Sequence, residues 1–402
     1  MATLIFTAIV LVGAGAWVLG HLYLYRRLAR DTTRRPWLRR LAAAALAGLA
    51  LLTLVAMVLP RLSGRVDGGW VVFGGLLWMG AAFYLVLALG LIDAGRGLFA
   101  LGRRLRNGRP FRRSELSGPA DPGRRAFLSR ALTGAAVFGA GGMSALAVRS
   151  ARWQIETPEV VVRLARLPAA LEGYRIALLS DLHLGPTLGV DFCRRVVAQT
   201  NALRPDAVAI TGDLVDGPVR LLAPALAPLA DLRPRQGVYF TTGNHEYYVD
   251  PHGWLAHLPR LGIRVLANQR VVLGDRDARG ARFVLAGIHD RRAAWFDPAH
   301  APDPAAALAG RDPEQAVVLL AHQPAQLEQV TGLGVDLQLS GHTHGGQLFP
   351  FGALTMLAQP YLAGLHRHDA TTQIYVSRGT GYWGPPMRMW APAEIGQIVL
   401  TG

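Results

Sequence analysis

The hydrophobic positions of this chain follow two patterns, which meet near residue 150. Before that point long apolar runs alternate with arginine-rich stretches, and after it short Val, Ile and Leu runs alternate with amphipathic stretches. Apolar runs of about 20 residues are long enough to cross a bilayer. Short apolar runs that alternate with helical spacing are typical of an α/β domain. The pattern therefore predicts a membrane region followed by an α/β domain.

Four apolar runs are candidate membrane spans. Residues 4–25, 41–59 and 70–92 are strongly apolar, and we assign residues 1–93 to three transmembrane helices. Residues 131–148 form a shorter run rich in Gly and Ala, which we predict as a fourth transmembrane helix. If this run does not insert, the domain that follows would stay in the cytoplasm.

The net charge of +15 lies entirely in the membrane region, because residues 1–150 hold 20 of the 42 basic residues and 5 of the 27 acidic ones. Residues 151–402 are formally neutral, which argues against the basic surface that nucleic-acid binding requires. The arginines gather between the first two spans and after the third. The positive-inside rule places both groups in the cytoplasm, so residues 151–402 are expected on the outer side of the membrane.

Residues 94–130 read as an Arg-rich cytoplasmic loop. The loop ends in Gly123-Arg-Arg-Ala-Phe-Leu-Ser-Arg130, which resembles a twin-arginine export signal. An ordinary basic flank of the fourth span explains the same residues equally well. Both alternatives carry the following domain across the membrane.

Helical spacing within the α/β region predicts helices at residues 191–203, 223–232 and 253–261, and residues 298–308 read as an Ala/Pro-rich surface loop. The single cysteine, Cys193, lies in the first of these helices and is interpreted as a small packing residue. One cysteine excludes an intramolecular disulfide.

Five apolar, strand-like segments end in candidate metal ligands. Carboxylate, imidazole and amide ligands without thiolate suit Mn²⁺, Fe or Zn²⁺. A two-metal hydrolase also needs one carboxylate between its ions, so that both can grip a phosphate. The candidate residues at the five segment ends are Asp181 and His183, Asp213, Asn244 and His245, His322, and His342 and His344.

The spacing within these motifs adds to the prediction. Asp181 and His183 are two residues apart, and on an extended backbone this spacing points both side chains the same way. His342 and His344 repeat the spacing and precede two glycines. A single Asp or His at a strand end is more often a cap or turn residue. Five such motifs in one domain together predict a two-metal site.

The order Asp-x-His, Gly-Asp, Gly-Asn-His-Glu, a lone His and Gly-His-Thr-His resembles the calcineurin-like metallophosphoesterase superfamily. The segments Gly341-His-Thr-His-Gly-Gly-Gln347, Ser377-Arg-Gly-Thr-Gly381 and Pro385-Pro-Met-Arg388 resemble its membrane-associated bacterial branch. That branch includes phosphodiesterase-type proteins and UDP-2,3-diacylglucosamine hydrolases of lipid A synthesis. The resemblance covers about residues 156–400 and leaves out the first three spans.

The resemblance implies a four-layer α/β/β/α sandwich over residues 151–402, preceded here by the all-α transmembrane region. It also implies two divalent ions (Mn, Fe or Zn), a hydroxide between them that attacks phosphorus, and His245 as the group that protonates the leaving oxygen or stabilises developing charge. Carried over by motif, the first ion is held by Asp181, His183, Asp213 and His344, and the second by Asp213, Asn244, His322 and His342.

Five further residues near these motifs have less defined roles. Glu246 is expected to orient its neighbours. His289 and Asp290 follow a predicted strand and either touch substrate, support the site or form a plain turn. Arg378 and Arg388 are candidates for binding a substrate phosphate, and surface ion pairing is the equal alternative.

The combined expectation is a multi-pass enzyme of the bacterial inner membrane with its catalytic domain in the periplasm or outside the cell. Its substrate would be a phosphodiester or pyrophosphate that is lipid-linked or comes from the envelope. Membrane lipids would be partners of the protein. The aromatic segments 295–296, 349–351 and 382–383 are interpreted as core rather than as a rim for acyl chains. A UDP-2,3-diacylglucosamine hydrolase and a non-catalytic membrane sensor of metal or phosphate are the alternatives.

Overall fold

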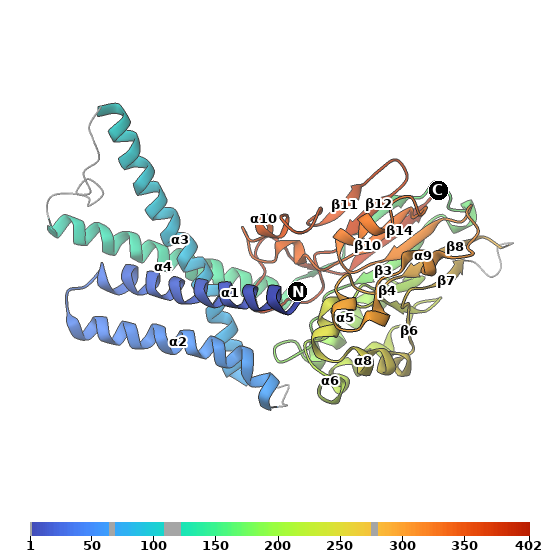
Figure 1. Ribbon diagram of the computed structural model, residues 1–402, viewed down its shortest axis with the longest axis horizontal. Helices are drawn as coiled ribbons and strands as arrows, with labels where there is room; N and C mark the ends of the chain where they lie inside the picture. Colours follow the sequence, from blue (N-terminus) through green and yellow to red (C-terminus); the bar gives the residue numbers. More distant parts are fainter. Residues whose placement is uncertain (1, 64–68, 108–121, 275–279) are drawn as a thin grey trace. The chain divides into compact units, whose positions relative to one another are not determined.

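The computed structural model describes residues 2–63, 69–107, 122–274 and 280–402, and the chain divides into two compact units (Figure 1). The first unit consists of helices from residues 2–59 and 70–147. The second is an α/β unit built mainly from residues 148–402. The boundary falls close to the change in hydrophobic pattern near residue 150.

Four long helices make up the N-terminal region. They are α1 (Ala2–Tyr25), α2 (Pro36–Ser63), α3 (Gly69–Asn107) and α4 (Pro122–Trp153), with a π-helical turn, η1 (Arg26–Arg30), after the first. Among the described residues, three helices are long and apolar enough to cross a membrane: Pro36–Pro60, Gly69–Arg106 and Ala126–Trp153. The first predicted span lies within α1, whose opening side chains are outside the described set, and stays a prediction.

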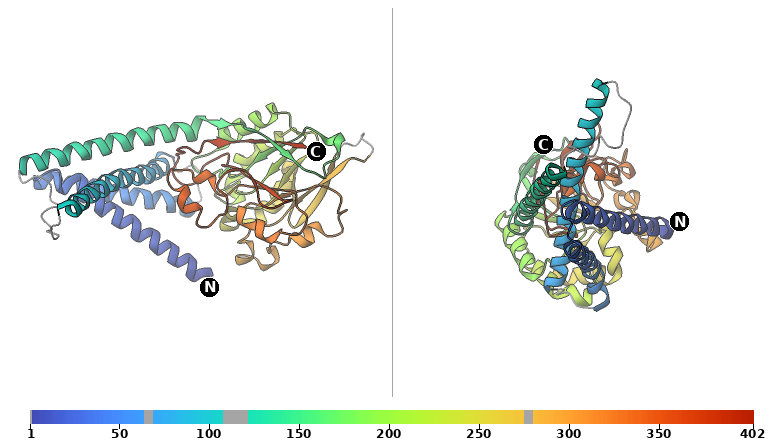
Figure 2. Two further views of the ribbon diagram at one scale, coloured as in Figure 1. Left: turned by 90° about the horizontal axis from the view of Figure 1, so that it is seen from above. Right: turned by 90° about the vertical axis from the view of Figure 1, so that its left-hand side faces the viewer.

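The segment 94–130 differs from the predicted loop at both ends. Helix α3 continues to Asn107, and α4 begins at Pro122 and runs unbroken through the twin-arginine-like motif (Figure 2). Arg, Leu and Ala all favour helix, so polar residues extend an apolar helix past the end of its hydrophobic stretch. Residues 108–121 of the predicted loop lie outside the described residues.

Small residues bring α2 and α3 together. A Cβ at Gly75 would collide with Ala56 and the Leu52 carbonyl, so only glycine permits this approach. The Thr53 hydroxyl donates a 2.9 Å hydrogen bond to the Gly75 carbonyl. Close contact at small residues with a hydroxyl-to-backbone bond is the usual way in which helices pack in a membrane.

Two six-stranded sheets form the second unit, with a third pair, β1 (Ile155–Glu156) and β13 (Ala393–Glu394), beside them. The first sheet has the order β2 (Glu159–Arg163), β14 (Gly396–Thr401), β3 (Tyr174–Leu179), β4 (Ala207–Ile210), β5 (Val238–Phe240) and β6 (Ile263–Val265). The second has the order β11 (Gly364–Arg367), β12 (Gln373–Val376), β10 (Leu337–Ser340), β9 (Val317–Leu320), β8 (Arg282–Gly287) and β7 (Gln269–Gly274).

Buried side chains from both sheets form one continuous core between them, including Ile176 and Leu178 from the first sheet and Leu285 and Leu320 from the second. Strands β3, β4, β9 and β10 are buried along their whole length or nearly so. Parallel strands that are covered on both faces read as unbroken apolar runs, which explains the sequence pattern.

Helices cover the outer face of each sheet, so the predicted four-layer α/β/β/α sandwich is confirmed. Helices α5 (Val190–Ala202), α6 (Val219–Leu226) and α8 (Pro251–His257) share a core with β3, β4 and β5. On the other side, α9 (Pro304–Leu308) and η8 (Pro324–Gln329) share a core with β9 and β12. The predicted surface loop at 298–308 is corrected, because Asp303 caps α9 and Leu308 is buried.

The last strand of the chain lies inside the first sheet. Strand β14 runs parallel to β2 on one side and antiparallel to β3 on the other. Strand β2 follows α4 and β1 in the sequence, and among the described strands it pairs in this sheet with β14 alone.

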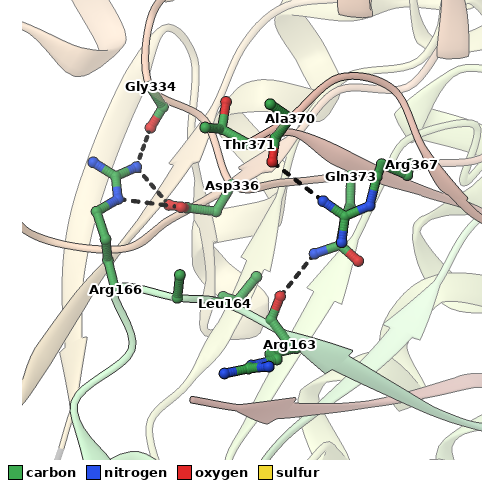
Figure 3. Close-up of a pocket in the computed structure, with 10 residues that line it drawn as sticks. Arg163, Leu164, Arg166, Gly334, Asp336, Arg367, Ala370, Thr371 and Gln373 are labelled. Carbon is green, nitrogen blue, oxygen red and sulfur yellow. Dashed lines mark hydrogen bonds and ion pairs between the residues drawn. The ribbon is translucent and has the colours of Figure 1, made fainter.

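A cavity of about 460 Å³ lies at the sheet edge where β10 and β12 begin (Figure 3). Arg166, which follows β2, donates 2.6 Å and 2.7 Å hydrogen bonds to the Gly334 carbonyl and the Asp336 carboxylate. The Gln373 amide donates to the Arg163 carbonyl at 2.7 Å. These bonds tie the two sheets together at the edge opposite the strand ends that carry the candidate ligands.

Candidate metal centre

All seven predicted ligands follow the carboxyl ends of strands. Asp181 and His183 follow β3, Asp213 follows β4, and Asn244 follows β5. His322 follows β9 and the remaining two histidines follow β10. Both sheets thus contribute predicted ligands to the same site. Every one of these residues except His342 is buried.

The backbone conformation at this place was not foreseen. Five of the predicted ligands have positive φ angles between 46° and 71°: Asp181, His183, Asp213, His342 and His344. The expected extended i, i+2 geometry is therefore wrong, because β3 and β10 end before these residues. A left-handed residue with a Cβ costs about 1–2 kcal/mol, and such strain is typical of functional sites.

The first cluster consists of Asp181, His183 and His344, whose candidate ligand atoms lie within 4.8 Å of one another. The Nε2 atoms of the two histidines are 3.1 Å apart, and His344 Nε2 lies 3.4 Å from Asp181 Oδ1. The Asp181 carboxylate accepts hydrogen bonds from the Ser180 hydroxyl at 2.6 Å and the His342 amide at 3.0 Å. These bonds fix the carboxylate in place.

The second cluster consists of Asp213, His322 and His342, again within 4.8 Å. His322 Nε2 lies 3.2 Å from Asp213 Oδ2, from Asn244 Oδ1 and from His342 Nδ1. The other nitrogen of His322 lies 2.7 Å from the Thr211 carbonyl, to which it donates. A ring held this way leaves Nε2 free to bind a metal.

Asp213 connects the two clusters. Its Oδ2 lies 3.2 Å from His322 Nε2 in the second cluster and 3.8 Å from His183 Nε2 in the first. A central carboxylate with one cluster on each side is the arrangement that a shared bridging ligand requires.

The donor set fits two cations. Burial raises the pKa of Asp213, but the nearby His322 and His245 outweigh burial and hold this pKa well below its usual range. Burial lowers the pKa of His322, and Asp213 outweighs it and raises the pKa to about 10. Asp213 thus keeps its negative charge and His322 holds a proton, which bound divalent ions would displace.

Asp216 is a site residue that the sequence analysis missed. Its Oδ1 lies 2.7 Å from His245 Nδ1 and 2.9 Å from His183 Nδ1, so one carboxylate oxygen orients two histidines. Burial lowers the pKa of His245, but Asp213 and Asp216 outweigh it and raise the pKa to about 9. The available signal was its position three residues after Asp213, next to Gly217-Pro218.

Glu246 orients the backbone of the site. Its buried carboxylate accepts hydrogen bonds from the amides of Gly243 and Leu214, both at 2.7 Å, and of Asp213 at 3.1 Å. These bonds tie the loop after β4 to the start of α7 (Asn244–Val249). The expectation that Glu246 orients its neighbours is thereby confirmed.

His289 and Asp290 support the wall of the site. His289 Nδ1 lies 2.8 Å from the Tyr247 hydroxyl, and Asp290 accepts a 2.8 Å hydrogen bond from the Gln323 amide. Both are buried. Among the three expected alternatives, the contacts match support of the site.

Neither arginine that was considered for phosphate binding is available in this structure. Arg378 is held by the carboxylates of Glu156 at 2.8 Å and Glu394 at 2.5 Å. Arg388 has no exposed surface and donates to the carbonyls of Ala391 and Gly381, while its Nη2 lies 3.2 Å from His344 Nδ1. Arg388 is therefore neither a phosphate ligand nor a surface ion pair, because backbone carbonyls surround it.

Two glycines allow the strand ends to converge. A Cβ at Gly243 would collide with the Asp213 carboxylate, and a Cβ at Gly341 would collide with Ser180 and Asp181. Each glycine lies where the motif from one strand end passes against a ligand from another. The Gly-Asn-His and Gly-His-Thr-His motifs thus need glycine for space.

The aromatic segments are mostly at the surface, which corrects their interpretation as core. Tyr382 is buried, but Trp383 is 53% exposed, and its ring lies 6.0 Å from that of His245. An exposed apolar platform follows the His344 turn directly and joins Trp390 through a 4.5 Å ring contact with Phe349. We define this platform as Phe349, Phe351, Leu354, Met356, Leu357 and Trp390, all exposed.

A four-layer sandwich with an Asp, His and Asn cluster at its strand ends defines the metallophosphoesterase class. The family model described as calcineurin-like phosphoesterase matches residues 174–346. A protein of Aquifex aeolicus named as an uncharacterized metallophosphoesterase is 32% identical over 250 residues, which cover 62% of this chain and 92% of that protein. The chain belongs to the calcineurin-like phosphoesterase family.

Two longer relatives are more similar in sequence. A "Transmembrane protein with metallophosphoesterase domain" of Danio rerio is 43% identical over 246 residues, covering 60% of this chain and 56% of that protein. An "Uncharacterized metallophosphoesterase" of Helicobacter pylori is 43% identical over 230 residues, covering 56% of this chain and 59% of that protein. The chain thus spans a little over half the length of these relatives.

Proposed function

We propose that this protein is a membrane-anchored dimetal phosphoesterase that hydrolyses a phosphodiester or pyrophosphate bond of a lipid-linked or envelope substrate. The observation that carries the proposal is the pair of ligand clusters joined by Asp213, with His245 beside them. Asp181, His183, Asp213 and His344 would hold one divalent ion, and Asp213, Asn244, His322 and His342 the other. Bound ions would neutralise the phosphate and activate water for attack.

Asp216 and His245 would control the proton transfer that accompanies hydrolysis. Asp216 holds His245 through Nδ1, so the ring presents Nε2 toward Asp213, 4.0 Å from its Oδ2. From there His245 would donate a proton to the leaving oxygen as the ester bond breaks. His245 also lies close enough to His183 and Asp213 to share an ion with them, and the proton-donor role is what the resemblance to the family implies for it.

The apolar platform supports a substrate with an acyl chain. Five of its six side chains come from the segment that follows the His344 turn, and the sixth, Trp390, contacts Phe349. Leu357 is 84% exposed. Exposed apolar patches of this kind mark sites that bind lipid or protein. The three apolar helices support membrane anchoring. The Danio rerio relative, by its name a transmembrane protein, agrees with it.

The arginine distribution supports a catalytic unit in the periplasm or outside the cell, in a multi-pass protein of the bacterial inner membrane. A UDP-2,3-diacylglucosamine hydrolase is the alternative within the same chemistry, and it requires the catalytic unit in the cytoplasm. The alternative without hydrolysis is a non-catalytic sensor of metal or phosphate. The presence of both His245 and its Asp216 partner favours catalysis.

The test is hydrolysis of bis-p-nitrophenyl phosphate and p-nitrophenyl phosphate by the full chain in detergent with Mn²⁺. We expect the diester to be cleaved, with a loss of about 10²–10⁴-fold in His245→Ala and at least as much in Asp213→Ala. His252→Ala and Asp191→Ala remove the same groups from exposed positions and should stay active. Bound metal with no turnover of any ester would leave the sensor alternative.

A further inference from the structure

A cluster of arginines lines a cavity inside the helical unit. The cavity measures about 790 Å³ and is lined by η1, the segment that leads into α2, and parts of α3 and α4. Eight arginines and two aspartates line it, a formal charge of +6. All of these residues belong to the helical unit.

The two aspartates leave most of this charge unbalanced. Asp31 and Asp93 both pair with Arg27, each at 3.2 Å. Arg39 and Arg130 instead donate to backbone carbonyls, at 2.8 Å to Thr33 and 2.9 Å to Thr32. Within the described residues, the other five arginines of the cavity have no carboxylate partner: Arg26, Arg30, Arg34, Arg35 and Arg96.

Two lining side chains are buried with polar atoms that lack a partner. Arg27 is 6% exposed and Ser129 is 7% exposed, and neither Arg27 Nη2 nor Ser129 Oγ has a hydrogen-bond partner among the described residues. An unsatisfied buried polar group costs roughly 1–3 kcal/mol, and more when charged. A site that keeps such groups is one that an anionic acceptor would complete.

The backbone at the cavity is also unusual. Arg26–Arg30 forms a π-helical turn directly after α1. Single π-helical turns are rare and occur frequently at functional sites. Here the turn carries three of the lining arginines, Arg26, Arg27 and Arg30, to the same cavity. Membrane topology alone requires positive charge on this side of the bilayer, but not a cavity that holds a buried guanidinium.

We propose that this cavity binds the phosphate headgroup of an anionic membrane phospholipid. Guanidinium groups bind phosphate oxygens with charge-assisted, bidentate hydrogen bonds, and basic pockets between membrane helices bind anionic headgroups. The volume is in the range of small-molecule sites. The flanking helices are apolar, so acyl chains would lie along them while the phosphate enters among the arginines. The site is separate from the metal centre and independent of the proposed hydrolysis.

Native mass spectrometry of the full chain in detergent tests the proposal, with phosphatidylglycerol and phosphatidylcholine that carry identical acyl chains. We expect phosphatidylglycerol to bind at least about tenfold more tightly than phosphatidylcholine. The double variant Arg30→Gln/Arg35→Gln should weaken phosphatidylglycerol binding by about tenfold. The matched control Arg103→Gln/Arg106→Gln removes two charges from α3 outside the cavity and should leave it unchanged.

Arg27→Gln extends the test to the buried guanidinium. If Arg27→Gln does not fold, the variant Arg30→Gln/Arg35→Gln still tests the site. Equal loss in the cavity variant and in the α3 control would overturn the site in favour of general charge attraction. Equal binding of the two lipids would overturn the headgroup assignment. Inorganic phosphate provides the second arm: binding of phosphate that the cavity variant abolishes, without preference for phosphatidylglycerol, would overturn the lipid source.

Discussion

The Asp216 carboxylate contacts two histidines that have different proposed roles in the site. The same oxygen contacts His183, a proposed ligand, and His245, the proposed proton donor. The ring orientations of ligand and donor are therefore linked. Partners that fix a ligand histidine typically contribute 10–100-fold to metal affinity or activity, which makes Asp216 a positioning residue rather than a catalytic one.

Asp216→Asn is expected to raise the Mn²⁺ concentration for half-maximal activity by about 10–100-fold, because His183 loses the anion that orients it. Turnover at saturating Mn²⁺ should also fall, because His245 loses the same anion. Asp297→Asn, which removes a carboxylate paired with His252 and His300, is the matched control. An unchanged Mn²⁺ midpoint in Asp216→Asn would contradict the role.

Cys193 provides a probe of the second unit. The side chain is fully buried in α5, as its helical pattern predicted, and burial raises the pKa of the thiol to about 12. Because the thiolate is the reactive form, alkylation of the native chain at pH 8 should be roughly a thousandfold slower than that of an ordinary thiol. At pH 8 the native protein should not react with a disulfide reagent. Protein unfolded in guanidinium should react with one equivalent of the reagent. Stoichiometric reaction of the native chain would contradict this.

At the scale of single residues, the sequence predicted which side chains the structure brings together but not the backbone conformation that does so. Asp181, His183 and His344 were recognisable because they follow apolar runs. Their left-handed backbone was not, because positive φ is uncommon even for Asp and His, and nothing in the neighbouring sequence marked these residues as exceptions. Arg388 was assigned to the surface or substrate, since nothing local shows that carbonyls from distant turns enclose a guanidinium.

Among the elements, the turns after the strands decide the site. Gly341→Ala places a Cβ against Ser180 and Asp181, and overpacking of this kind costs about 1–3 kcal/mol. We expect a matching loss of thermal stability together with weaker metal binding at the first cluster. Gly189→Ala, at the start of α5 with nothing within 4 Å of its new methyl, should cost less than about 1 kcal/mol. Equal stability of the two variants would contradict the steric argument.

Element existence was predictable and element edges were not. The fully buried strands read clearly as apolar runs, and the helix predicted at 191–203 is α5. The polar end of α3 was placed in a loop because hydropathy marks a span and not a helix. Helix α9 was missed because five residues are too few for a periodic pattern, although Asp303 at its N-cap was a usable signal.

At the scale of the whole molecule, if the substrate is lipid-linked, changes in the apolar platform should affect the hydrolysis only of substrates that carry an alkyl chain. Leu357→Ser/Phe351→Ser should lower kcat/KM for dodecyl p-nitrophenyl phosphate by about tenfold or more, since each buried side chain is worth roughly 1.5–3 kcal/mol. The methyl ester should be unaffected. Val161→Ser/Val272→Ser removes two exposed apolar side chains from other strands and serves as the control. An equal effect on both esters would contradict a role in chain binding.

The position of β14 has a consequence for the order of biogenesis. Strand β2 follows the helical region, yet the strand that it pairs with in the described part of the sheet comes 238 residues later, at Gly396–Thr401. The first sheet is completed only when β14 has been synthesised, and until then β2 and β3 present open edges of the kind that invite aggregation. We therefore expect truncation of the chain before Gly396 to leave the second unit prone to aggregation, because β2 and β3 would then lose the strand that joins them.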